Sequence, residues 1–177
     1  MAFLSPRVMV DNLNIKPGSN IIDLGAGSGA YVYEAIRVNG KSGQVIAIDI
    51  DKEKLKMVKD TCFYGGYVID TLLADLDKPL ILPDYTADYI ILANTLHLCD
   101  NKESLLKECN RILAPNGYML FVEWCNHEGN SFKLGPSTDI IIKKEEAINM
   151  LREANFQVLK ELPAGDFHYS FLINKLK

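Results

Sequence analysis

Three glycines close together constrain the fold of this chain more than any other feature of its sequence. Gly25, Gly27 and Gly29 follow the apolar run Asn20 to Leu24 and precede an amphipathic stretch that starts at Ala30. A residue without a Cβ atom adopts turns that other residues avoid and lets another molecule approach the backbone closely. A strand, a glycine turn and a helix in this order are typical of the first unit of an open α/β sheet that binds a ligand above the turn.

The rest of the chain repeats this alternation of strands and helices. Short β-rich runs alternate with amphipathic stretches, which is the pattern of helices on both faces of a mostly parallel sheet. We expect strands at residues 20–24, 44–48, 71–74, 87–93, 118–124, 156–161 and 167–174. The last two are separated by Pro163 and Gly165, so we expect them to form an antiparallel hairpin. The predicted fold class is α/β, a Rossmann-like three-layer sandwich.

Two aspartates stand where the second and third expected strands end. Asp49 lies about 20 residues past the glycine loop, where a carboxylate can accept hydrogen bonds from the hydroxyls of an adenosine ribose. Asp75 can accept from an adenine amino group, and Leu76 beside it can cover the adenine ring. An aspartate at a strand end often caps the helix that follows it or simply faces water, so neither residue alone indicates a ligand. The order and spacing of all three features therefore carry the prediction of an adenosine site.

At this point the chain closely resembles the class I S-adenosylmethionine-dependent methyltransferases. The similar branch is that of the small enzymes of ubiquinone and menaquinone biosynthesis, and the resemblance runs from about Ser5 to Lys175. The motifs that carry it lie at residues 21–29 (IIDLGAGSG), 45–51 (VIAIDID), 73–75 (LAD), 87–94 (ADYIILAN) and 111–117 (RILAPNG). One departure is Asn116, where the family usually has a glycine; it should affect a turn and leave the chemistry alone.

The resemblance implies a seven-stranded sheet in the order 3-2-1-4-5-7-6, with only strand 7 antiparallel. It also implies S-adenosylmethionine as the cofactor, with S-adenosylhomocysteine as the product. The glycine loop would hold the methionine part, Asp49 the ribose, and Asp75 with Leu76 the adenine, while Asn94 would approach the methionine end. The cofactor-binding residues expected in this way are Asp23, Gly25, Ala26, Gly27, Gly29, Asp49, Ile50, Asp75, Leu76 and Asn94.

We expect a single domain over residues 1–177, because this length suits one compact core. It would consist of an N-terminal helical segment (1–19), a cofactor-binding core (20–124), and a loop, a helix and a closing β-hairpin (125–177). No apolar run approaches the ~20 residues of a membrane span, no secretory signal begins the chain, and the four cysteines have no CxxC spacing. We therefore expect a cytoplasmic protein with no membrane span and no metal site.

The acceptor of the methyl group is less well defined than the cofactor. His97, Trp124 and Tyr169 are the residues expected to face a small-molecule acceptor, and no catalytic residue is assigned. A base is needed only if the acceptor must lose a proton near neutral pH. Asn94 is followed by Thr95, unlike the prolines of the base-modifying relatives, and the net charge is −4, so a DNA target is not expected.

Two alternatives remain open on the sequence alone. The glycine loop also fits the dinucleotide fingerprint through Gly25, Gly27 and Ala30, which would suit an NAD-dependent oxidoreductase. The second alternative is a non-catalytic S-adenosylmethionine-binding module that acts through a partner protein. Only the segment before Asn20 and the loop Asn126 to Asp139 are free to cover the acceptor, so either the pocket is shallow or a second subunit completes it, as in a homodimer.

Overall fold

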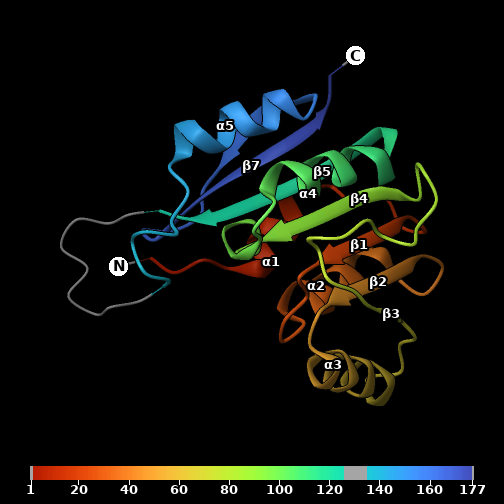
Figure 1. The fold of residues 1–177 in the computed structure, drawn as a ribbon. Coiled ribbons are helices and arrows are strands. Elements are labelled where there is room, and N and C mark those ends of the chain that lie inside the picture. Colours follow the sequence, from red (N-terminus) through yellow and green to blue (C-terminus); the bar gives the residue numbers. More distant parts are fainter. Residues whose placement is uncertain (1, 126–134, 177) are drawn as a thin grey trace.

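A computed structural model describes residues 2–125 and 135–176 of the chain (Figure 1). Helices and strands alternate along the sequence as expected. The helical elements are α1 (Pro6–Asn12), α2 (Ala30–Asn39), α3 (Lys52–Tyr64), the 3₁₀ helix η1 (Leu96–Leu98), α4 (Lys102–Ile112) and α5 (Lys144–Glu153). The strands are β1 (Asn20–Leu24), β2 (Gln44–Asp49), β3 (Asp70–Leu73), β4 (Ala87–Ala93), β5 (Leu113–Trp124), β6 (Phe156–Leu162) and β7 (His168–Lys175).

All seven strands form one sheet in the order β3-β2-β1-β4-β5-β7-β6. Strands β1 to β5 pair in parallel, whereas β7 runs antiparallel to both β5 and β6. The predicted order and the predicted hairpin are therefore confirmed. Leu24 lies opposite both Ile48 and Leu92, so β1, β2 and β4 end at the same edge of the sheet. The loops that follow these strands meet along this carboxyl edge, which is where open α/β sheets bind ligands.

The central strands are buried on both faces, and each face packs against its own group of helices. Ile21 and Ile91 belong to a cluster with residues of α1, α2 and α3, whereas Ile22 and Ile90 belong to a cluster with residues of α4 and α5. Successive side chains of a strand point to opposite faces, which accounts for this division. Figure 1 shows α3 at the β2–β3 end of the sheet and α5 at the β6–β7 end. The three layers of the predicted sandwich are thus present.

Strand β5 begins earlier than the sequence pattern predicts. Leu113 already pairs with Ala87, and regular pairing resumes where Tyr118 lies opposite Tyr89. One residue of β4, Asp88, therefore lies opposite four residues of β5, so residues 114–117 bulge out of the ladder. The proline and the glycine in this bulge, which lack a ladder N–H and a side chain respectively, are typical of such an irregularity.

The described residues contain no helix long and apolar enough to cross a membrane. Within the same ranges there is no group of three or more His, Cys, Asp or Glu side chains that could hold a metal ion.

Candidate functional site

The glycine loop between β1 and α2 uses glycine where any side chain would collide. Gly25 has φ of +75°, and a Cβ atom there would lie 2.3 Å from Oγ1 of Thr95. Gly29 has φ of +82°, and its Cβ atom would lie 2.8 Å from the side chain of Val58. The N–H groups of Gly25 and Ala26 both donate to the carbonyl of Ile48, at 2.8 and 2.9 Å. These contacts bind the loop tightly to the ends of β2 and β4.

Asp49 connects the glycine loop to the end of β2. Its Oδ2 accepts a hydrogen bond from the N–H of Gly27 at 2.8 Å, and its Oδ1 accepts from the N–H of Asp51 at 2.9 Å. The side chain of Asp51 in turn caps α3 by accepting from the N–H groups of Glu53 and Lys54. Asp49 is only 8% exposed, yet each of its oxygens keeps a further lone pair for a ligand.

Asp75 follows β3 on the neighbouring strand and is more exposed. Its Oδ1 accepts from the N–H of Asp77 at 3.0 Å, and its Oδ2 lies 3.2 Å from Nζ of Lys78. The hydrogen bond from Asp77 and the ammonium group of Lys78 hold the pKa of Asp75 below its ordinary value. The carboxylate is therefore ionised at neutral pH and fixed in orientation beside Leu76.

Asp23 lies under the glycine loop and is buried without a full set of partners. The residue is 2% exposed, and its Oδ2 has no hydrogen-bond partner among the described residues. Burial, and to a smaller extent the charge of Asp49, raises the pKa of Asp23 to about 7. The hydroxyl of Tyr31 is likewise buried without a partner, and burial raises its pKa. A positively charged group at this position would satisfy Asp23 and favour its ionised form.

Asn94 ends β4 in a left-handed conformation with φ of +54°. Its Nδ2 lies 3.2 Å from Nε2 of His168 on β7, while its Oδ1 is buried without a partner. The ring of His168 stacks at 4.1 Å on Trp124, the last residue of β5. Burial lowers the pKa of His168 to about 4, so the imidazole is neutral at physiological pH. His168 thus joins the segment after β4 by a polar contact and the end of β5 by a ring contact.

A cavity of about 350 Å³ lies at this edge, above the ends of β1, β2 and β4, and its volume suits a small organic ligand. Its lining residues are Gly25, Gly27, Asp49, Ile50, Lys54, Ala74, Asp75, Leu76, Asp77, Asn94, Thr95, Leu98 and Cys99. The structure thus brings seven of the ten expected cofactor-binding residues into one cavity. Asp23, Ala26 and Gly29 are not in the lining and support the loop from behind.

Several lining residues were not expected from the sequence. Lys54 reaches the cavity from the first turn of α3, while Thr95, Leu98 and Cys99 come from the segment around η1. The position directly after a strand end is the only sequence signal that could have indicated them. The carboxylates of Asp49 and Asp75 each have an apolar side chain beside them, Ile50 and Leu76 respectively. This combination suits a flat ring system that carries amino and hydroxyl groups.

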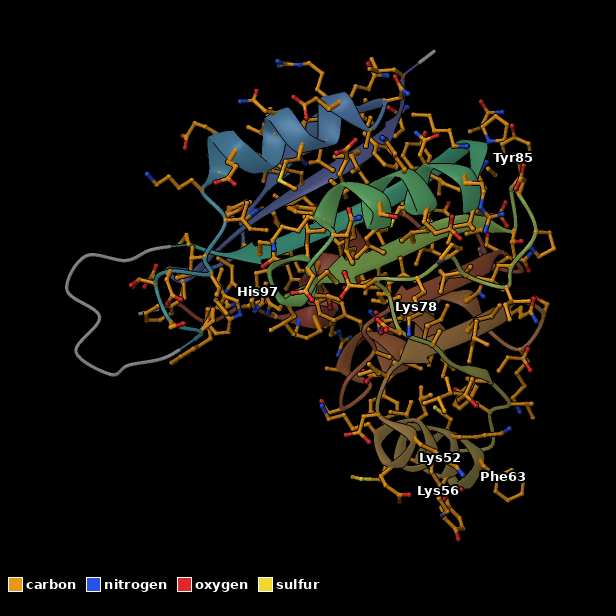
Figure 2. All side chains as sticks on the ribbon, viewed as in Figure 1. Lys52, Lys56, Phe63, Lys78, Tyr85 and His97 are labelled. Atoms are coloured by element: carbon orange, nitrogen blue, oxygen red, sulfur yellow. The ribbon has the colours of Figure 1, made fainter. Side chains whose placement is uncertain are left out.

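The structure places the three residues expected to face an acceptor in different environments. His97 is buried in η1, with Nδ1 2.7 Å from Oε2 of Glu123, and Figure 2 shows it where β4 ends. Trp124 is partly exposed at the end of β5. Tyr169 belongs to the buried cluster under α4 and α5, and its hydroxyl donates to the carbonyl of Ile142 at 2.9 Å. This placement gives Tyr169 a packing role, so we leave it out of the acceptor site.

The N-terminal segment closes part of the same edge near the β6–β7 turn. The backbone N–H of Ala2 donates to Oδ2 of Asp166, and the N–H of Asp166 donates to the carbonyl of Ala2. The rings of Phe3 and Phe167 stack with centroids 6.0 Å apart. Residues that precede α1 therefore cover the start of β7, next to His168.

Comparison with known proteins gives consistent results. A family model described as "Methyltransferase domain" matches residues 22–121. The "Ubiquinone/menaquinone biosynthesis C-methyltransferase UbiE" of Burkholderia mallei is 31% identical over 111 residues, which cover 63% of this chain and 45% of that protein. The chain thus spans about half the length of the curated relatives it matches.

Two solved structures resemble the fold closely. One is a SAM dependent methyltransferase from Aquifex aeolicus, with a TM-score of 0.86 and 23% identity, covering 97% of this chain and 89% of that chain. The other is the [4+2]-cyclase SpnF, with a TM-score of 0.83 and 16% identity, covering 97% of this chain and 80% of that chain. Because a protein named as a cyclase shares the architecture, likeness of fold alone does not define the reaction.

Proposed function

The chain belongs to the methyltransferase domain family, and from this membership we propose that it transfers the methyl group of S-adenosylmethionine to a small-molecule acceptor. The observation that carries the proposal is the cavity in which the glycine loop, Asp49 and Asp75 meet. A sulfonium methyl group is already activated, so the protein mainly has to align the acceptor with the S–C bond and exclude water.

We assign the adenosine part to the ends of β2 and β3. Asp49 would accept hydrogen bonds from the ribose hydroxyls with its remaining lone pairs, and Asp75 would accept one from the adenine amino group. Ile50 is 69% exposed and Leu76 is partly exposed beside the same cavity, so their side chains are available to cover the two faces of the adenine ring.

We assign the methionine part to the glycine loop, Asp23 and Asn94. The unpartnered, buried Oδ2 of Asp23 supports this assignment, because the α-ammonium group of a methionine moiety would supply the missing positive partner. Oδ1 of Asn94 is also buried without a partner, and Asn94 lines the cavity. A Cβ atom at Gly25 would collide with Thr95, so only glycine fits at this position. Without a side chain there, the backbone of the loop stays open to a ligand.

The acceptor proposal rests on the similar relatives and on the end of the sheet beyond Asn94. The relative of Burkholderia mallei carries a name that assigns it C-methylation in ubiquinone and menaquinone biosynthesis. We therefore take a reduced quinone ring, a hydroquinone, as the first acceptor class to test. Trp124 and His97 lie at the carboxyl edge beyond Asn94.

Calorimetry with S-adenosylmethionine, S-adenosylhomocysteine and NAD in parallel tests the cofactor site. We expect micromolar-range binding of the first two and none of NAD. Asp49→Ala should cost about 1.5–3 kcal/mol of binding free energy, since it removes hydrogen bonds to a charged acceptor. Asp51→Ala is the matched control, because it removes a carboxylate two residues away that is not in the cavity lining. Full affinity in Asp49→Ala would remove the ribose assignment.

The two alternatives from the sequence make different predictions in the same experiments. An NAD-dependent oxidoreductase would bind NAD and release heat in that titration. A non-catalytic module would bind S-adenosylmethionine but release no S-adenosylhomocysteine with any acceptor. A methyl-transfer assay with radiolabelled S-adenosylmethionine, against hydroquinones and a wider metabolite panel, separates this module from an enzyme.

A further inference from the structure

A buried acid–base pair lies beside the cavity and takes no part in the cofactor contacts proposed above. Glu123, near the end of β5, is 1% exposed, and His97 is 7% exposed. Oε2 of Glu123 lies 2.7 Å from Nδ1 of His97, and Oε1 accepts from the backbone N–H of His97 at 3.3 Å. A buried carboxylate is costly unless it is paired and hydrogen-bonded. Here both of its oxygens are used to hold one histidine in one orientation.

This hydrogen bond decides which nitrogen of His97 is basic. With the proton on Nδ1 directed at Glu123, the lone pair of the neutral ring lies on Nε2. Nε2 has no hydrogen-bond partner among the described residues, and it is not one of their buried unpartnered polar atoms. The side chain of His97 is 4% exposed. An imidazole oriented by a carboxylate, with its second nitrogen free, has the arrangement of a general base.

His97 is not in the cavity lining itself, but its neighbours on both sides in the chain are. Asn94 and Thr95, which precede it, and Leu98 and Cys99, which follow it, all line the cavity. Figure 2 shows His97 at the carboxyl end of β4, far from the labelled α3 residues Lys52 and Lys56. By the assignment above, the methionine end of the cofactor lies at Asn94. His97 is therefore next in sequence to residues on the side of the cavity where an acceptor would approach the methyl group.

We propose that His97 is the general base of the methyl transfer and that Glu123 is its positioning residue, so that the acceptor is a nucleophile that must lose a proton. This inference rests on the proposed function. The proton of the acceptor's O–H group, or of an equivalent acid, moves to Nε2. The electron pair of the resulting anion forms the bond to the methyl carbon, and the pair of the broken S–C bond stays on sulfur. Glu123 stabilises the imidazolium, which then returns its proton to water.

Other titratable groups near Glu123 do not interfere in the neutral pH range. Burial lowers the pKa of His168 to about 4 and raises the pKa of Cys99 to about 11. Burial also raises the pKa of Tyr169, whose charge would be further opposed by Glu123. None of these three side chains changes its charge between pH 6 and 9. A pH effect in this interval that differs between the unmodified chain and Glu123→Gln therefore does not come from these three side chains.

Three variants separate a base from a structural histidine. His97→Asn keeps an N–H donor at the position of Nδ1 and has no atom equivalent to Nε2. Glu123→Gln keeps an acceptor for His97 and removes the charge. Ser170→Ala is the matched control, since it removes a buried hydrogen bond, from Oγ to the carbonyl of Leu162 at 2.9 Å, on the adjacent strand β7. Each variant is first checked for unchanged S-adenosylmethionine affinity and for cooperative thermal unfolding.

Two probe acceptors distinguish the chemistry. 1,4-Dihydroxynaphthalene must lose a proton on methylation, whereas nicotinamide is methylated on a ring nitrogen that carries no proton. With the first probe at pH 7, His97→Asn should lower kcat about 100-fold or more, with the KM for S-adenosylmethionine unchanged. The loss should shrink at high pH, where the probe ionises in solution. Glu123→Gln should also lower kcat with the KM for S-adenosylmethionine unchanged, and Ser170→Ala should leave kcat as it is.

Three results would overturn the inference. One is a His97→Asn rate within about threefold of the unmodified chain on 1,4-dihydroxynaphthalene. Another is an equal loss on nicotinamide, which would make the histidine structural. The third is methylation of nicotinamide but not of 1,4-dihydroxynaphthalene, which would contradict an acceptor that must lose a proton.

A measurement without an acceptor covers the case in which neither probe reacts. Diethyl pyrocarbonate modifies an accessible unprotonated imidazole nitrogen, and peptide mass spectrometry locates the product. We expect modification of His97, and slower modification in Glu123→Gln because the carboxylate charge no longer favours attack by Nε2. If His97 is unreactive in a chain that still binds S-adenosylmethionine, the assignment of His97 as the base is refuted and the proposed function is not. Loss of S-adenosylmethionine binding from the unmodified chain refutes the proposed function instead.

Discussion

Replacement of Asp23 by asparagine tests the buried carboxyl group under the glycine loop most directly. The pKa of Asp23 is raised to about 7 from an ordinary value of 3.8, because the group is buried and lies near the charge of Asp49. The folded chain therefore holds the Asp23 proton more tightly than the unfolded chain does. Protonation contributes stability that is fully present below the unfolded pKa and is lost as the pH rises through the folded pKa.

The magnitude follows from the size of this shift. A difference of about three pKa units corresponds to about 4 kcal/mol of unfolding free energy, lost between about pH 4 and pH 8. Asp23→Asn has no such proton and should lack this part of the pH dependence. A buried asparagine amide adds a constant cost, since its N–H groups have no assigned partners, but that cost is the same at every pH.

Urea unfolding of the ligand-free chain and of Asp23→Asn, at intervals from pH 4.5 to 8, provides the assay. The difference in unfolding free energy between the two should shift in favour of the variant by several kcal/mol as the pH rises. A difference that stays constant over this range would refute the buried, proton-linked state of Asp23. Other carboxyl groups titrate equally in both chains, so they cancel in the comparison.

The same proton should appear in cofactor binding. At pH 6 only about a tenth of Asp23 is ionised, and an ammonium group placed beside it would favour the ionised form. S-Adenosylhomocysteine binding at pH 6 should therefore release a proton, which calorimetry in two buffers of different ionisation enthalpy detects. Asp23→Asn should release none and should bind more weakly at pH 8. Equal proton release by both chains would contradict the assignment of the methionine ammonium to Asp23.

Three further variants test the loop, a helix cap and the core. Gly25→Ala should weaken S-adenosylmethionine binding in calorimetry and lower the unfolding free energy by about 1–3 kcal/mol, since φ is +75° and the new Cβ atom meets Thr95. Unchanged affinity would contradict the role of this loop in binding the cofactor. Asp51→Ala should cost about 1 kcal/mol in urea unfolding through loss of the α3 cap, with cofactor affinity retained. Phe121→Ala, at a side chain with 0% exposure, should cost about 3–5 kcal/mol, and a cost below 1 kcal/mol would mean that this core position is loosely packed.

The architecture could be predicted because its signals are local and repeated. The bounds of β1 and β4 match the apolar runs at 20–24 and 87–93. The order of the strands came from the family resemblance, and the register of the sheet confirms it. The early start of β5 was missed because a bulge breaks the pattern of alternation between Leu113 and Tyr118.

The sequence by itself determined the cofactor side of the site. The glycine loop and the two aspartates each follow a strand, and parallel strands bring their carboxyl ends to one edge, so order along the chain was enough to predict that they meet. Their contacts with the cofactor stay a prediction. On the acceptor side, spacing along the chain carried no such information.

Only the tertiary structure decided which polar residues are partners there. The structure pairs His97 with Glu123, 26 residues away, and Asn94 with His168, 74 residues away, while it buries Tyr169 in the core. The physical reason is that a side chain's partner depends on which face of the sheet it lies on and how far the neighbouring strand extends. Both are set by packing among distant segments, and neither is written in the local pattern of residues.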